Sequence, residues 1–181
     1  MATSAKPDLL ALVDSLNRHE VDYVLIGGMA AVVYGATRLT DDLDILARDM
    51  DDNMERLSAA LNDLHATSDI AEHVSTFELR AMNTRWSTAA GTVDVLVSAK
   101  GPAGTTINWR MIEPTARTIV HEGHQVRIAA LDDLLVMKLS VGRPRDISVA
   151  EELVPGSSEA FQTYLADRAA VSQGLFDRAD E

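Results

Sequence analysis

Two aspartates, Asp42 and Asp44, stand two positions apart in a segment where polar and apolar residues alternate. Alternation of period two predicts a half-buried strand with both carboxylates on one face and Leu43 and Ile45 on the other. Neighbouring carboxylates repel each other and ionise together only at a high cost unless a cation lies between them. Hard divalent cations such as Mg²⁺ prefer oxygen ligands of this type, so the pair predicts a metal site.

A third carboxylate, Asp94, stands in the segment 93–97, where three valines alternate and would face the core. Alone, Asp94 would be read as a solvated residue on an ordinary strand. If its strand neighbours that of Asp42, three carboxylates converge and form a two-metal site. Asp42, Asp44 and Asp94 are therefore the predicted metal ligands and catalytic carboxylates, and Asp146 is an alternative third carboxylate.

Gly27 and Gly28 follow the apolar run 23–26 and open a short apolar helix. Glycines at such a turn let a phosphate approach free backbone N–H groups, although they are also common there for packing reasons. Arg38 and Thr40 lie between the glycines and the aspartates. They could contact a phosphate or its metal, or be ordinary loop residues.

Lys138 lies within the nearly apolar segment 134–141, so its ammonium group emerges from a core-facing stripe of a predicted helix. One interpretation is that the side chain reaches past its neighbours to solvent. The other is that it places a phosphate-binding charge at the wall of a pocket. Arg143 and Asp146 follow just beyond the end of this helix.

The elements that must position these residues alternate irregularly along the chain. Hydrophobic periodicity predicts helices over 7–19, 29–34, 51–64, 131–141 and 157–171, and strands over 23–26, 42–46, 73–82, 86–98, 117–121 and 125–129. This order favours an α+β fold with a mixed or antiparallel sheet over a regular βαβ chain. We expect a core over 1–129 and a small C-terminal helical part, 130–181, packed on it.

The composition is that of a globular protein of 181 residues, with 46% apolar and 24% charged residues. The absence of cysteine excludes disulfides, zinc fingers, iron–sulfur clusters and thiol catalysis. There is no apolar signal segment at the N-terminus and no uncharged apolar window long enough to span a bilayer. We therefore expect a cytoplasmic protein without a membrane partner.

A net charge of −12 argues against a nucleic-acid partner, but the charge is unevenly distributed. Residues 76–146 carry 9 Lys and Arg against 7 Asp and Glu, whereas residues 1–75 carry 5 against 14. Either the surface is simply uneven, or a phosphate-rich substrate approaches the middle of the chain. With only 8 aromatic residues, base stacking cannot be the main means of holding an RNA.

Together these residues resemble the DNA-polymerase-beta-like nucleotidyltransferase superfamily. The resemblance rests on Ile26-Gly27-Gly28, a spacer of thirteen residues, the Asp42-Leu43-Asp44 motif and a later third carboxylate. Within the superfamily, the segments 26–31, 35–42 and 138–146 are similar to the AbiEii/MenT branch, the toxin halves of bacterial toxin–antitoxin pairs. The resemblance covers residues 22–146.

The resemblance implies a five-stranded mixed sheet flanked by helices, Mg²⁺ at Asp42 and Asp44, and transfer of a nucleoside monophosphate from a nucleoside triphosphate (NTP). MenT-like relatives add nucleotides, often pyrimidines, to the 3′ end of tRNA. The implied partners are thus an NTP, tRNA or another RNA as acceptor, and an antitoxin protein. The residues expected to bind the nucleotide are Gly27, Gly28, Arg38, Thr40, Lys138, Arg143 and Asp146, and Lys138 is also expected to be catalytic.

Two other functions remain open from the sequence. One is a small-molecule nucleotidyltransferase similar to the aminoglycoside and lincosamide enzymes of the same superfamily, since an acidic chain suits a cationic acceptor. The other is a non-catalytic binding module, which the three retained aspartates disfavour.

Overall fold

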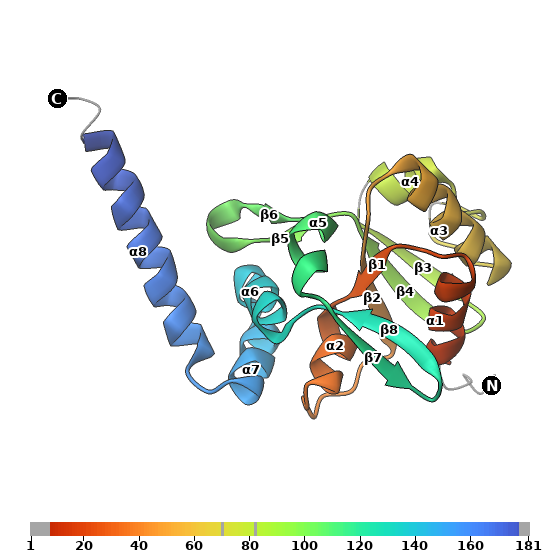
Figure 1. Cartoon of the computed structure of the whole chain (residues 1–181), viewed down its shortest axis with the longest axis horizontal. Helices are drawn as coiled ribbons and strands as arrows, with labels where there is room; N and C mark the ends of the chain where they lie inside the picture. The colour runs from red at the N-terminus through yellow and green to blue at the C-terminus, as the bar shows by residue number, and fades with distance from the viewer. Residues whose placement is uncertain (1–7, 70, 82, 178–181) are drawn as a thin grey trace.

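The centre of the computed structural model, which describes residues 8–69, 71–81 and 83–177, is a six-stranded mixed sheet of order β3-β4-β2-β1-β8-β7 (Figure 1). Its strands are β1 (Tyr23–Leu25), β2 (Asp42–Ala47), β3 (Thr84–Thr88), β4 (Gly91–Leu96), β7 (Arg117–His121) and β8 (His124–Ile128). The α+β class and the mixed sheet are confirmed. The sheet has six strands instead of five, since the hairpins β3–β4 and β7–β8 each contribute a pair beside β1 and β2.

The register of the sheet sets the positions of its charged residues. Strand β2 runs antiparallel to β1 and parallel to β4, and Asp44 lies directly opposite Asp94 in the β2–β4 pair. In the antiparallel β3–β4 pair, Arg85 lies opposite Asp94. Directly opposite residues project from the same face of a sheet. The register therefore places Asp44, Asp94 and Arg85 in one row across three strands.

Helices pack against both faces of the sheet. The helices are α1 (Leu9–Arg18), α2 (Gly27–Val33), α3 (Asp51–Asp63), α4 (Thr76–Ala81), α5 (Trp109–Ile112), α6 (Leu131–Val141), α7 (Pro144–Leu153) and α8 (Ser157–Asp177). A small hairpin of β5 (Ala99–Lys100) and β6 (Thr106–Ile107) lies near α5 and α6, and α8 extends away from the body (Figure 1). No helix in the described part of the chain is long and apolar enough to cross a membrane.

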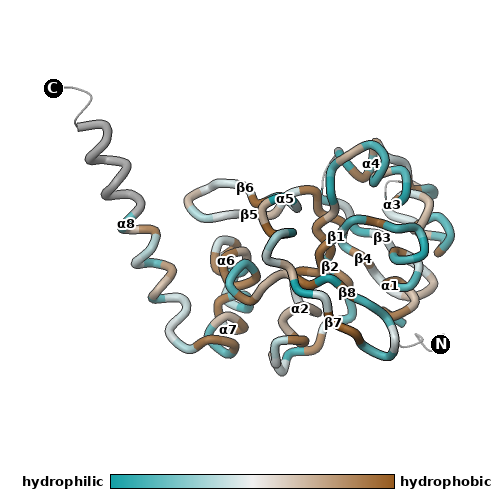
Figure 2. The backbone as a smooth tube through the Cα atoms, viewed as in Figure 1, coloured by the Kyte–Doolittle hydropathy of each residue, from teal (hydrophilic) through white to brown (hydrophobic). Residues whose placement is uncertain are grey.

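One face of the sheet, with Leu43 and Ile45 of β2, packs against the apolar sides of α1, α3 and α4. The opposite face carries Leu46, which packs in a second core with residues of α5 and α6. Side chains alternate along a strand, so Asp42 and Asp44 share this second face with Leu46. The second face is thus apolar at one end of β2 and acidic at the other. Figure 2 shows hydrophobic residues gathered on the central strands.

The strand predicted over 73–82 is wrong, because this segment contains helix α4. Ser75 precedes the helix, and its backbone N–H donates to the carboxylate of Glu78 at 2.9 Å, while its hydroxyl accepts from the Glu78 backbone N–H at 3.4 Å. This reciprocal pair is a capping box, which starts a helix. Met82 lies outside the described residues, as does Pro7 of the predicted first helix.

The single strand predicted over 86–98 is also wrong, because a turn divides the segment into β3 and β4. The hydroxyl of Thr88 accepts from the backbone N–H groups of Ala90 and Gly91 and donates to the Gly91 carbonyl. One side chain thereby satisfies the polar groups of the turn. Helix α7 was not predicted, although Pro144 in its first turn is a common helix start.

A buried asparagine in the first turn of α3 forms hydrogen bonds with the residue that precedes β1 and with the residue that follows β2. Asn53 is fully buried, and its side chain accepts from the Asp22 N–H and donates to the carbonyls of Asp22 and Arg48 at 2.7–3.0 Å. Replacing Asn53 by alanine leaves the Asp22 N–H without this partner and removes one of two hydrogen bonds from each carbonyl, since these still accept from the N–H groups of Arg48 and Met50. We expect Asn53→Ala to lower the free energy of unfolding by about 2–3 kcal/mol in urea denaturation.

The control for this prediction is Asn108→Ala, because Asn108 is exposed and makes no side-chain capping hydrogen bond. Its effect should stay within about 0.5 kcal/mol. Equal effects of the two substitutions would show that the Asn53 hydrogen bonds do not stabilise the fold.

Candidate active site

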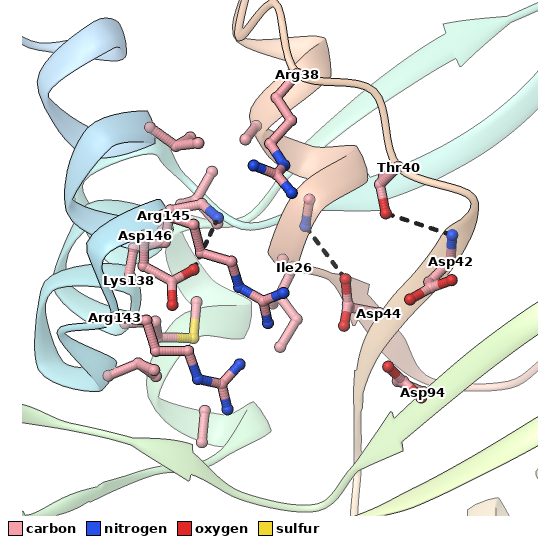
Figure 3. Close-up of a pocket in the computed structure, with 18 of the residues that line it drawn as sticks. Ile26, Arg38, Thr40, Asp42, Asp44, Asp94, Lys138, Arg143, Arg145 and Asp146 are labelled. Atoms are coloured by element: carbon pink, nitrogen blue, oxygen red, sulfur yellow. Dashed lines mark hydrogen bonds and ion pairs between the residues drawn. The ribbon is translucent and has the colours of Figure 1, made fainter.

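A cleft of about 1080 Å³ opens where the second face of the sheet turns from apolar to acidic. One wall comes from β2, β4 and the turn into α2, and the other from α6 and α7 (Figure 3). All ten of the predicted site residues line it: Gly27, Gly28, Arg38, Thr40, Asp42, Asp44, Asp94, Lys138, Arg143 and Asp146. The structure therefore brings together side chains that are far apart in the sequence.

Asp44 is the central carboxylate of the first wall. Burial raises its pKa, and repulsion from Asp94 and Asp42 acts in the same direction. Two groups act against this shift: the backbone N–H of Gly28, which donates to Asp44 Oδ2 at 3.2 Å, and the charge of Lys138. Because the ionised form is disfavoured, an added cation beside Asp44 would be stabilising.

Asp42 and Asp94 are joined by a guanidinium group. Arg85 donates from Nε and Nη2 to the two oxygens of Asp94 at 2.8 and 2.7 Å, and from Nη2 to Asp42 Oδ2 at 2.7 Å. These hydrogen bonds, with Asp94 contributing most, raise the pKa of Arg85. Arg85 is therefore the cation that accompanies these two carboxylates here.

Lys138 and Asp146 form the core of the opposite wall. The Lys138 side chain is only 8% exposed, and its Nζ lies 3.8 Å from Asp146 Oδ1 (Figure 3). Burial lowers the pKa of Lys138, and Arg145 contributes in the same direction, whereas Asp146 and Asp44 raise it. The interpretation in which Lys138 reaches past its neighbours to solvent is therefore wrong.

Three arginines bring further positive charge to the cleft. Arg38 lies between α2 and β2, and Arg143 and Arg145 flank the start of α7 (Figure 3). All three are exposed, and none has a carboxylate ion-pair partner among the residues that the structure describes. Arginines without carboxylate partners are well suited to bind phosphate oxygens, because the planar guanidinium can donate two parallel hydrogen bonds.

The glycines at the start of α2 have a packing role, which the sequence left open as the alternative to phosphate binding. Gly27 has a φ of +66°, and a Cβ at this position would lie 2.1 Å from Asp44 Oδ2. The Asp44 carboxylate thus occupies the space that a side chain at position 27 would need. The same carboxylate accepts a hydrogen bond from the Gly28 N–H. A phosphate contact of these glycines remains a prediction. Thr40 supports the same region, since its hydroxyl accepts from the Asp42 N–H at 3.4 Å.

The carboxylates lie together on one face but do not form a metal cage. Among the described residues, no three His, Asp or Glu side chains are grouped so that they could hold a metal ion on their own. Proteins usually bind Mg²⁺ through one or two carboxylates, with waters and substrate phosphates completing the shell. Asp42 and Asp44 offer such oxygens, because both project from one face of β2 into the cleft that the cationic wall also lines. These residues therefore fit Mg²⁺ held jointly with a phosphate.

Sequence reasoning placed Arg85 and Arg145 only in a general basic segment and assigned neither to the site. In the structure Thr84 and Trp86 are buried and alternation turns Arg85 to the opposite face, but neither of the strands predicted over 73–82 and 86–98 includes Arg85. Arg145 lies one residue before the predicted site residue Asp146, in the first turn of a helix that was not predicted.

No protein-family model matches the sequence, and no curated protein matches it. Solved structures do match. The antibiotic-resistance factor ANT(2″)-Ia has a TM-score of 0.56 at 12% identity, over 94% of this chain and 95% of that one. The lincosamide antibiotic adenylyltransferase LnuA, with lincomycin bound, has a TM-score of 0.56 at 13% identity, over 81% and 94% of the two chains.

A Thermotoga maritima protein assigned as a nucleotidyltransferase has a TM-score of 0.50 at 13% identity, over 80% of this chain and 88% of that one. The chain therefore has the nucleotidyltransferase fold, as its sequence motifs predicted. At these identities the similarity defines the fold alone.

The close approach of Gly27 to Asp44 gives a direct test of the first wall. Gly27→Ala adds a methyl group in contact with the carboxylate and places alanine at a positive φ, which alone costs about 1–2 kcal/mol. We expect it to lower the free energy of unfolding by more than this. We also expect it to weaken Mn²⁺ binding at least about tenfold, the size of effect seen when a group that orients a metal ligand is changed. Urea denaturation and Mn²⁺ titration measure the two effects.

Gly35→Ala is the matched control, because Gly35 has a φ of +104° but nothing lies within 4 Å of an added Cβ. It should lose stability through backbone strain and keep its Mn²⁺ affinity. If both variants bind Mn²⁺ like the unmodified protein, Gly27 does not serve to make room for Asp44.

Proposed function

We propose that this chain is a metal-dependent nucleotidyltransferase, which transfers a nucleoside monophosphate from an NTP to a hydroxyl group. One observation carries the proposal: two aspartates, Asp42 and Asp44, face a cationic wall across a single cleft. That wall is formed by Lys138, Arg143 and Arg145. A metal–triphosphate substrate needs both kinds of group, because carboxylates hold the metal and cations hold the phosphates.

In the proposed reaction, the acceptor oxygen forms a bond to the α-phosphorus of the NTP. The bond from this phosphorus to the oxygen that bridges to the β-phosphorus breaks, and pyrophosphate leaves with that oxygen. Mg²⁺, when held by Asp42 and Asp44, would supply positive charge that stabilises the transferring group.

The hydroxyl proton of the acceptor passes to a carboxylate in this proposal. Asp94 is the better placed candidate, because it lies directly opposite Asp44 on the neighbouring strand. Arg85 binds both Asp94 oxygens, so Asp94 can accept the proton only after this guanidinium has moved aside. Asp146 is less suited, because it lies on the opposite wall, away from the face of the sheet that carries Asp42 and Asp44. General bases must lie within hydrogen-bond reach of the proton that they accept, which the position of Asp94 beside the metal ligands allows.

The cations of α6 and α7 would bind the β- and γ-phosphates and stabilise the leaving pyrophosphate. Lys138 is held in a fixed position by burial and by Asp146, so its charge needs little reorganisation when substrate binds. Arg143 and Arg145 are exposed and can adjust to the phosphate oxygens. Arg38 would approach the same phosphates from the side of α2.

RNA is the first candidate acceptor. The segment Lys138–Asp146 resembles the AbiEii/MenT branch, which would make the chain a cytoplasmic toxin that adds a nucleotide, preferably a pyrimidine, to the 3′ end of tRNA. Such an activity would require an antitoxin protein to restrain it. The three arginines without carboxylate partners support this acceptor, because they would attract a polyanion to the cleft.

A small hydroxylated molecule is the second candidate acceptor. Three arginines of the basic segment 76–146 are paired with carboxylates. Arg80 pairs with Asp49 and Asp51, Arg85 pairs within the site, and Arg127 pairs with Glu113. The segment therefore offers an RNA less positive surface than its charge count indicates. ANT(2″)-Ia, known in complex with adenylyl-2″-tobramycin, and LnuA have small antibiotics as ligands, and this chain spans nearly their whole length.

Removing either metal-binding carboxylate should abolish transfer without unfolding the protein. We expect Asp42→Asn or Asp44→Asn to lower kcat at least about a thousandfold, the effect of losing several kcal/mol of transition-state stabilisation. Asp44→Asn should also keep or raise the thermal stability of the metal-free protein, because it removes a buried, repelled charge. Pyrophosphate release and thermal melting are the measurements. Full activity in either variant would contradict the metal-site assignment.

The acceptor is identified by incubating the protein with Mg²⁺, each α-labelled NTP and either total RNA or a panel of aminoglycosides and lincosamides. An RNA acceptor predicts label in a tRNA-sized band and a rate that falls steeply with salt, because RNA binding releases counterions. A small acceptor predicts labelled drug and unlabelled RNA. Asp44→Asn is the negative control in both arms, and label in neither arm would exclude both acceptor classes.

A further inference from the structure

Arg85 enters the active site because of the register of the sheet and not only through its side-chain conformation. Its neighbours Thr84 and Trp86 are buried on the first face, so Arg85 must project from the second face. On that face it stands directly opposite Asp94, which in turn stands opposite Asp44. The fold thus places a permanent cation beside two of the three carboxylates, Asp94 and Asp42.

The geometry of Arg85 allows it to neutralise two carboxylates at once. Its Nε and Nη2 bind both oxygens of Asp94, and the same Nη2 binds Asp42 at 2.7 Å. Such forked hydrogen bonds between charged groups are among the strongest that side chains make. An arginine stays protonated at all relevant pH values, so this cation can leave the carboxylates only by moving.

We propose that Arg85 is a resident counter-cation of the active site, which competes with a divalent metal for Asp42 and thereby couples metal binding to nucleotide binding. This inference rests on the metal-dependent transfer proposed above. A metal at Asp42 and a guanidinium on the same carboxylate repel each other. Free metal must therefore displace Arg85 from Asp42, and the cost of this displacement weakens the binding of the metal.

A bound nucleotide removes this penalty. Arg85 lines the cleft and its side chain is 61% exposed, so it has room to move away from Asp42. The phosphates of an NTP offer it new oxygen acceptors in the same cleft. Metal and nucleotide then bind with positive cooperativity, and the coupling acts equally on both ligands. In this way Arg85 disfavours binding of metal without substrate.

Arg80 offers a matched control, because it also binds two carboxylates. Its Nε lies 2.8 Å from Asp49 and its Nη2 lies 2.7 Å from Asp51. The Arg80 cluster stands outside the cleft, since none of its three residues lines it. Replacing Arg80 therefore removes a comparable ion-pair cluster without touching the proposed metal ligands.

The test is equilibrium binding of Mn²⁺ alone to the full chain, followed by electron paramagnetic resonance of the free ion. We expect Arg85→Met to bind Mn²⁺ about tenfold tighter than the unmodified protein, within the range of typical coupling between sites. The experiment is repeated with a saturating ATP analogue that carries a methylene bridge between the α- and β-phosphates. The difference in Mn²⁺ affinity between Arg85→Met and the unmodified protein should then shrink to about twofold or less. Arg80→Met should match the unmodified protein in both conditions.

Arg85→Lys is the second variant, because it keeps the charge and folds if Arg85→Met does not. A lysine cannot bind two carboxylates through a fork, so its Mn²⁺ affinity should lie between those of the other two proteins. Circular dichroism and thermal melting establish that each variant is folded.

Unchanged or weaker Mn²⁺ binding by the Arg85 variants in the absence of nucleotide overturns the inference. The inference is also overturned if the ATP analogue raises the Mn²⁺ affinity of the unmodified protein and of Arg85→Met by the same factor. If the unmodified protein binds no Mn²⁺ even with the analogue, both the inference and the metal-dependent function fail. If the Mn²⁺ results are as expected but no NTP is used, only the proposed function fails.

Discussion

Repulsion among three carboxylates on one face of two paired strands is the constraint on which the rest of the structure depends. The parallel pairing of β2 and β4 fixes Asp44 opposite Asp94, and alternation along β2 adds Asp42 to the same face. Like charges at this spacing are destabilising unless cations or hydrogen-bond donors compensate them. The neighbouring strand supplies Arg85, helix α6 supplies Lys138, and the turn into α2 supplies a backbone N–H.

The apolar part of the same face holds this arrangement in place. Leu46 continues the row of the two β2 aspartates and is fully buried beneath α5 and α6. This packing fixes the position of α6, and so of Lys138, relative to β2. Gly142 ends α6 with a φ of +71°, a conformation suited to glycine, and the chain turns directly into α7. The turn brings Asp146 back to Lys138, so one wall of the cleft is built from two successive helices.

The sequence was informative where short-range patterns determine the structure. It was less informative where the structure depends on pairing between distant segments. Alternation, motif spacing and the family resemblance together named ten site residues, including the pair Asp42 and Asp44, and all ten line one cleft. The errors over 73–82 and 86–98 came from side-chain hydrogen bonds at a helix start and a turn, which override hydrophobic periodicity. The pairing of Arg85 could not be foreseen, because it depends on the β3–β4 register. The strand predicted over 86–98 also begins one residue after Arg85. Charge counted by segment likewise missed that acids of 1–75 neutralise arginines of 76–146.

The parallel β2–β4 pair also has a consequence for how the protein is made. Parallel strands need a long crossover, and contacts between distant segments form late and slowly during folding. A chain that emerges from the ribosome presents the aspartates of β2 long before α6 and α7. Until those helices emerge and fold, the carboxylates have no cationic wall opposite them. The candidate site is thus complete only after α7 has emerged, and a nascent chain interrupted before Lys138 would carry the first wall of the cleft without the second.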